Sequence, residues 1–87
     1  MNDLHTLQKK LQFKSSHRGS KEMDILLGSF VEKYIKLFND GELQMLEAIL
    51  ELDDNDIYRY ALDKVTIPKE IDNRVMQLLK DFTMLKK

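Results

Sequence analysis

The stretch MDILLGSFVEKYIKLF, residues 23–38, places its apolar side chains at the spacing of an α-helix. One stripe of large apolar residues recurs every three or four positions, at Met23, Leu27, Phe30, Tyr34 and Phe38. Further apolar residues widen this stripe, at Leu26, Val31, Ile35 and Leu37. So broad a face predicts a central helix, over residues 20–38, that packs against neighbours on several sides.

Helical periodicity continues on both sides of this segment, and strand-like alternation is absent from the sequence. We predict further helices at residues 3–13, 41–52, about 54–65 and 69–85. Asn39 and Glu42 have the spacing of a capping box at the start of the third helix. Asp54 is the predicted cap of the fourth, and Pro68 suits the first turn of the fifth. The sequence predicts an all-α, compact five-helix bundle, with residues 1–87 as a single domain.

Composition narrows the classes of function. The 87 residues contain no cysteine, which removes disulfides and thiol chemistry, and no apolar run of about 18 residues that would span a membrane. The beginning of the sequence lacks the apolar core of a signal peptide, so we expect an intracellular, cytoplasmic protein without membrane insertion. A chain this short shares one core among its apolar residues, so an enclosed active site is not expected.

Charge is balanced overall, with a formal net charge of −1, but it is unevenly distributed. Residues 1–21 hold five bases and one acid, whereas residues 47–56 hold five acids and no base. Such polarity fits either an ordinary solvated surface with uneven charge or a polarised surface that orients a protein partner. Lys9, Lys10 and Lys14 also leave open an alternative function, a helical adaptor or regulator with weak nucleic-acid binding. The acid-rich half argues against nucleic acid as the main partner.

The sequence contains little evidence of a metal site or a catalytic site. The segment DDNDI begins like a calcium loop, but the positions that need glycine and glutamate hold Tyr58 and Lys64. The two histidines, His5 and His17, fall on different predicted elements. The serines beside His17 are its neighbours in a loop, and such neighbours rarely converge as a triad. We therefore predict no metal site, no catalytic residues and no enzymatic activity.

The segment HRGSKE, residues 17–22, leads into the central helix. Gly19 would give the backbone freedom before that helix, and Glu22 and Asp24 would place negative charge in its first turns. Arg18 and Glu22 are four positions apart and could pair if the helix extended back that far. A helix start alone leaves unexplained an exposed arginine beside a glycine that permits close approach of a partner.

RGSKE, residues 18–22, resembles the Arg-Gly-x-x-Glu signature of the succinate dehydrogenase assembly factor family, called SdhE in bacteria. The flanking EMDILL and the later AILELDDNDIYRYAL also resemble segments of that family, at matching spacing. Two positions depart from its pattern: His17 stands where a second arginine is common, and Tyr60 where tryptophan is common.

The resemblance implies a small all-α factor that binds the flavoprotein subunit of succinate dehydrogenase or fumarate reductase. Such factors promote covalent attachment of FAD to a histidine of that subunit, and hold no flavin stably themselves. The resemblance also implies that Arg18, Gly19 and Glu22 contact the partner, with His17 and Asp24 beside them. A second contact would involve the acidic turn, at Asp53, Asp54 and Asp56. We expect a monomer whose exposed Arg18 donates to the client, so that Arg18→Ala would alter stability little.

Overall fold

The computed structural model describes residues 3–85, and within that range every regular element is helical. The elements are α1 (Asp3–Ser16), α2 (Lys21–Tyr34), the 3₁₀ turn η1 (Ile35–Leu37), α3 (Asp40–Leu50), α4 (Asp54–Ala61) and α5 (Arg74–Leu85). The predicted all-α bundle of five α-helices is confirmed over this part of the chain.

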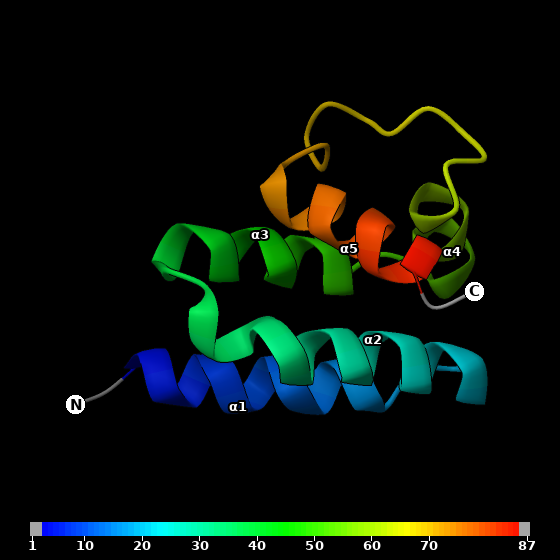
Figure 1. The fold of residues 1–87 in the computed structure, drawn as a ribbon. Helices are drawn as coiled ribbons and strands as arrows, with labels where there is room; N and C mark the ends of the chain where they lie inside the picture. Colours follow the sequence, from blue (N-terminus) through cyan, green and yellow to red (C-terminus); the bar gives the residue numbers. More distant parts are fainter. Residues whose placement is uncertain (1–2, 86–87) are drawn as a thin grey trace.

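The helices form two layers (Figure 1). Helices α1 and α2 lie antiparallel and side by side in one layer, and α3 and α5 lie over them with α4 at one end. Helix α1 contacts both α2 and α3, while α5 packs against α3 and α4 and also touches α2. This arrangement brings the α1–α2 loop close to the turn between α3 and α4.

Helix α2 supplies the centre of the core, as its apolar face predicts. Leu27, Phe30 and Val31 are fully buried, and the Phe30 ring lies 5.5 Å from the ring of Phe82 on α5. The predicted single helix over residues 20–38 ends at Tyr34, and the chain tightens into η1 before Phe38 turns extended. Phe38 stays buried after this change of geometry, whereas Leu37, one of the residues that widen the predicted stripe, is 73% exposed.

The capping box at the start of α3 is confirmed. The Asn39 side chain accepts from the Glu42 backbone N–H at 2.8 Å, and the Glu42 carboxylate accepts from the Asn39 N–H at 3.0 Å. Each side chain satisfies an amide that the helix leaves unpaired. Arg74 on α5 also pairs with Glu42 at 3.2 Å, which links the start of α3 to the start of α5.

The predicted end of the fourth helix and the predicted start of the fifth are wrong, while the other bound of each is confirmed. Helix α4 ends at Ala61, because Asp63 takes a φ of 61° that no helix continues, and Val65 is 42% exposed. Helix α5 begins at Arg74, where the Asn73 side chain accepts from the Met76 N–H at 3.0 Å. Pro68 lies in the preceding connection, so a side-chain cap starts α5 and the proline does not.

Candidate functional site: the loop between α1 and α2

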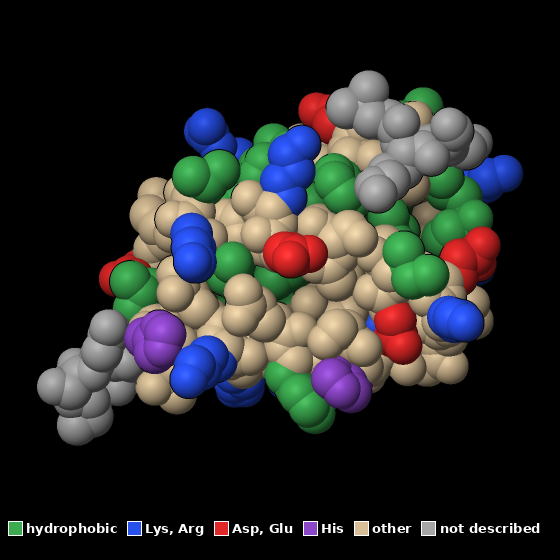
Figure 2. Space-filling model, turned by 60° about the horizontal axis from the view of Figure 1, so that its bottom comes forward, with side chains coloured by type: hydrophobic (Ala, Val, Ile, Leu, Met, Phe, Trp, Pro, Cys, Tyr) green, Lys and Arg blue, Asp and Glu red, His purple; other side chains and the backbone are tan. Residues whose placement is uncertain are grey.

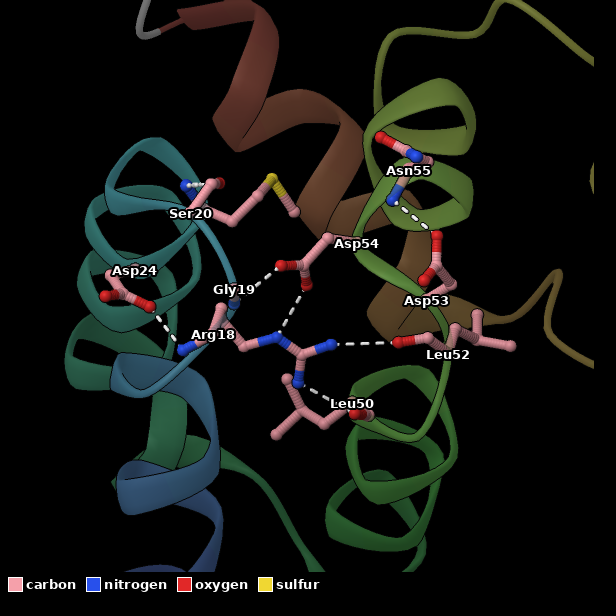
Figure 3. A network of polar contacts seen from close by, with 10 residues as sticks. Arg18, Gly19, Ser20, Asp24, Leu50, Leu52, Asp53, Asp54 and Asn55 are labelled. Carbon is pink, nitrogen blue, oxygen red and sulfur yellow. Dashed lines mark hydrogen bonds and ion pairs between the residues drawn. The ribbon is translucent and has the colours of Figure 1, made fainter.

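Residues 17–20 connect α1 to α2 and lie against the turn that connects α3 to α4 (Figure 3). Ser20 caps α2, since its hydroxyl accepts from the Met23 N–H at 3.1 Å. Two segments that are more than 30 positions apart in the sequence therefore form one site. Its centre is the side chain of Arg18.

The Arg18 guanidinium turns inward and bonds to three groups. Its Nε donates to Asp54 Oδ1 at 2.7 Å, and its Nη1 and Nη2 donate to the carbonyls of Leu50 and Leu52, each at 2.8 Å. Only 11% of its side chain is exposed. Since both carbonyls lie at the C-terminal end of α3, the positive charge also suits the helix dipole there. The fork of Arg18 thus ties the α1–α2 loop to the end of α3 and the start of α4.

Two carboxylates hold the backbone of the same loop. The second oxygen of Asp54, Oδ2, accepts from the Gly19 N–H at 3.0 Å, so one carboxylate binds both residues of the Arg-Gly pair. The Asp24 carboxylate accepts from the Arg18 N–H, reaching back from the first turn of α2. The path of the loop is therefore set by side chains of α2 and α4.

Several expectations for this segment are wrong. Arg18 was expected to be exposed, yet it is mostly buried and its carboxylate partner is Asp54. Since α2 begins only at Lys21, the condition for an Arg18–Glu22 pair within one helix is not met. The cap of α4 is Asp53, which accepts from the Asn55 N–H at 3.1 Å, and Asp54 is free to bind the loop because Asp53 has that role. Whether these residues also contact a partner stays a prediction.

The backbone conformation at position 19 does not require a glycine, because the φ of Gly19 is not positive. A Cβ built there would lie 3.4 Å from Asp54 Oδ2, which is a close but tolerable contact. The predicted need for conformational freedom at Gly19 is therefore wrong. Its exposure instead leaves backbone open to approach from outside the molecule.

Exposed side chains surround Gly19 and form what we call the loop surface: Gly19, Ser20, Glu22, Asp53, Asn55 and Tyr58. These residues line two adjoining shallow hollows, one on each side of the Arg18–Asp54 pair. Glu22 makes no side-chain hydrogen bond or ion pair to the other described residues, so its carboxylate faces solvent. Tyr58, 40% exposed, adds an aromatic rim.

The other predicted site residues take separate positions. His17 lines one hollow, and its ring stacks on the exposed ring of Phe13 with centroids 3.9 Å apart. Asp56 pairs with Arg59 at 2.8 Å on the outside of α4. The three acids of the turn thus have three different local roles. The sequence analysis did not single out Phe13 and Tyr58, because both occupy ordinary apolar positions of predicted helices. It also could not identify the carbonyls of Leu50 and Leu52, because backbone groups have no sequence signal.

The predicted basic patch on α1 is partly neutralised. Lys10 pairs with Glu47 of α3 at 3.2 Å, and Lys14 pairs with Glu51 just beyond the end of α3, so two of its three lysines bind acids. On the face shown in Figure 2, basic and acidic side chains are interspersed. This arrangement disfavours the nucleic-acid alternative, which needs a concentrated positive field.

Fold and site together define a small helical protein with an exposed surface around the loop between α1 and α2. The family described as "Flavinator of succinate dehydrogenase" matches residues 9–83, which include both halves of the site. The chain belongs to this family.

Curated relatives agree with that assignment. The chain is 33% identical over 79 residues to "Succinate dehydrogenase assembly factor 2, mitochondrial" of Dictyostelium discoideum, covering 91% of this chain and 56% of the relative. It is 36% identical over 80 residues to assembly factor 2-A of Drosophila willistoni, covering 90% and 51%. The chain thus spans about half the length of the curated relatives it matches.

Proposed function

We propose that this chain is an assembly factor that binds the flavoprotein subunit of succinate dehydrogenase, or of fumarate reductase, and promotes covalent attachment of FAD to it. The observation that carries the proposal is the family match over residues 9–83, within which the Arg-Gly-x-x-Glu segment forms the centre of an exposed surface. The names of the relatives, succinate dehydrogenase assembly factors, support the same client.

The factor acts by positioning and carries out no chemistry of its own. The flavoprotein forms the bond between its histidine and its FAD, and a partner accelerates that step by holding both in a reactive geometry. Such a role needs a complementary surface, and the shallow hollows around Gly19 suit it. We expect the flavin to stay in the client, with none held by this chain.

Within the proposed contact, each signature residue has a different role. Glu22 offers an unpaired carboxylate to a cationic or N–H group of the client, where a charge-assisted hydrogen bond forms. Gly19 allows client backbone to approach closely because it has no side chain. Arg18, which bonds within the chain, holds this surface in place.

The proposal also covers the oligomeric state and the cellular location of the factor. We expect the free factor to be a monomer that acts in the bacterial cytoplasm, although the relatives are named as mitochondrial proteins. Among residues 3–85, no helix is long and apolar enough to cross a membrane.

The direct test co-expresses the chain with a succinate dehydrogenase flavoprotein subunit and measures flavin fluorescence of that subunit after denaturing electrophoresis. Covalent flavin survives denaturation, so fluorescence reports the attached fraction. We expect a marked increase when the factor is present. Equal fluorescence with and without the factor would contradict the proposal.

Matched variants identify the surface responsible. Glu22→Ala should remove most of the increase, whereas Glu32→Ala, which removes an exposed acid further along α2, should retain it. Gly19→Arg should also remove it, because a long side chain blocks approach, while Gly19→Ala should retain most of it. Circular dichroism checks that all four variants are folded. An unchanged increase with Glu22→Ala and Gly19→Arg would place the contact elsewhere.

A further inference from the structure

The carboxylate of Asp54 connects two parts of the loop at once. One oxygen accepts from the Arg18 side chain at 2.7 Å and the other from the Gly19 backbone at 3.0 Å (Figure 3). Its side chain is 22% exposed, and both oxygens are directed at the loop. Since both oxygens are engaged inside the molecule, Asp54 is poorly placed to serve as a contact for a partner.

We infer that Asp54 is a positioning residue for the loop surface, acting through Arg18 and Gly19 and not through the client. The inference rests on the proposed function and extends its site from the signature to a residue 36 positions away from Arg18. The working unit is then Arg18, Gly19, Glu22 and Asp54, with Gly19 and Glu22 facing outward and Arg18 and Asp54 facing inward.

The neighbouring acids are engaged elsewhere: Asp24 accepts from the Arg18 backbone N–H, and Glu51, whose charge also interacts with that of Arg18, pairs with Lys14. Asp53 caps α4 through Asn55, and Asp56 pairs with Arg59. Without the Asp54 carboxylate, a mostly buried guanidinium would lose the carboxylate bonded to it, and the Gly19 N–H would lose its acceptor. Unsatisfied groups of this kind favour another loop conformation, in which they reach water. The outward residues would then be presented less often in their binding geometry.

Asp54→Asn tests this by removing the charge with little change of shape. We expect affinity for the purified flavoprotein subunit, measured by titration calorimetry, to fall about tenfold, the loss expected for one charged hydrogen bond. Asp63→Asn makes the same change at an exposed acid just beyond the end of α4, where it pairs with Lys80, and should bind as the wild type does. Ile57→Val, a mild core change on α4, controls for lost stability and should also bind normally.

A double-mutant cycle separates positioning from contact. If Asp54 acts through Arg18, then Asp54→Asn, Arg18→Met and the double variant should lose similar affinity, because each breaks the same unit. If Asp54 contacts the client itself, the two losses should add. Additive losses would overturn the inference.

The Gly19 amide gives a second readout that needs no client. Only three glycines occur in the sequence, so its NMR signal is readily assigned. In Asp54→Asn this amide proton should move upfield and exchange faster with solvent, because its carboxylate acceptor is gone, while Gly41 should not change. An unchanged Gly19 amide would overturn the inference.

These outcomes are distinct from failure of the proposed function. If the wild-type chain does not bind the flavoprotein, the proposed function fails, whatever the Gly19 amide does. If the wild type binds and Asp54→Asn binds equally well, the proposed function stands and the inference about Asp54 is wrong.

Discussion

Arg18 and Glu22 belong to one five-residue motif but face opposite ways. The Arg18 side chain is 11% exposed and donates to Asp54 and to two carbonyls at the end of α3. Glu22, in the first turn of α2, is exposed. A change at Arg18 therefore acts through stability and loop geometry, while a change at Glu22 acts at the surface alone.

This difference gives a prediction that departs from the sequence-based expectation for Arg18. Arg18→Ala should lower the free energy of unfolding by about 2 kcal/mol, because Asp54 and two carbonyls lose a charged donor. Glu22→Ala should stay within about 0.5 kcal/mol of the wild type. Urea denaturation followed by circular dichroism measures both values. Arg59→Ala, at an exposed ion pair, is the control and should cost little. A wild-type stability for Arg18→Ala would show that the inward bonds contribute nothing.

Between elements, charged pairs join α1 to α3. Lys10 and Lys14 extend from α1 to Glu47 and Glu51 on the facing side of α3 and just beyond its end. The hydrogen bond from Lys14 to Glu51, and its positive charge, lower the pKa of Glu51 below its ordinary value of 4.5. These pairs link α1 to α3 and to the residue that follows it.

The Glu51 pair makes stability depend on pH. A carboxyl whose pKa is lowered on folding contributes stability that is present above about 4.5 and is lost as pH falls through the folded value. Lys14→Met should therefore flatten the acid side of the curve of unfolding free energy against pH. Urea denaturation over a pH series measures this, with Lys9→Met as the control on the same helix. High salt should shrink the difference because it screens exposed charges. If the unfolding free energy of Lys14→Met fell as steeply at acid pH as that of the wild type, this assignment would be contradicted.

Across the whole molecule, one apolar core joins the described helices. Phe30 lies at its centre, with its ring 5.1 Å from Tyr34 and 5.5 Å from Phe82. Buried residues of α1, α3, α4 and α5 belong to the same cluster, among them Leu11, Leu46, Ile57 and Leu79. A shared core of this kind predicts cooperative unfolding without a separate subdomain.

Phe30→Ala should lower the free energy of unfolding by about 3–5 kcal/mol, because it removes a large side chain and leaves a cavity. Circular dichroism and tyrosine fluorescence should report the same urea midpoint, since all helices share this core. Leu37→Ala, at a side chain that is 73% exposed, should change stability by about 0.5 kcal/mol or less. Two separated transitions would show that the layers unfold independently.

How much the sequence predicts differs between local and tertiary features. The helical class, the central helix and the Asn39–Glu42 capping box follow from residues close together in the chain, and the structure confirms them. The end of α4 and the start of α5 were predicted wrongly, because the φ of Asp63 and the Asn73 cap compete with a continuing apolar pattern. Periodicity alone does not reveal which local signal ends a helix.

By itself, the sequence determined the all-α class, the family signature at residues 18–22 and the neighbouring acids as candidate site residues. Only the tertiary structure decided that Arg18 faces inward, that Asp54 is its partner and that Glu22 remains exposed. The reason is physical. Helix patterns depend on neighbours within about four positions, whereas the partner of a charged side chain depends on how distant helices pack. Arg18 and Asp54 are 36 positions apart in the sequence, and they come into contact only when α1, α2, α3 and α4 assemble around their common core.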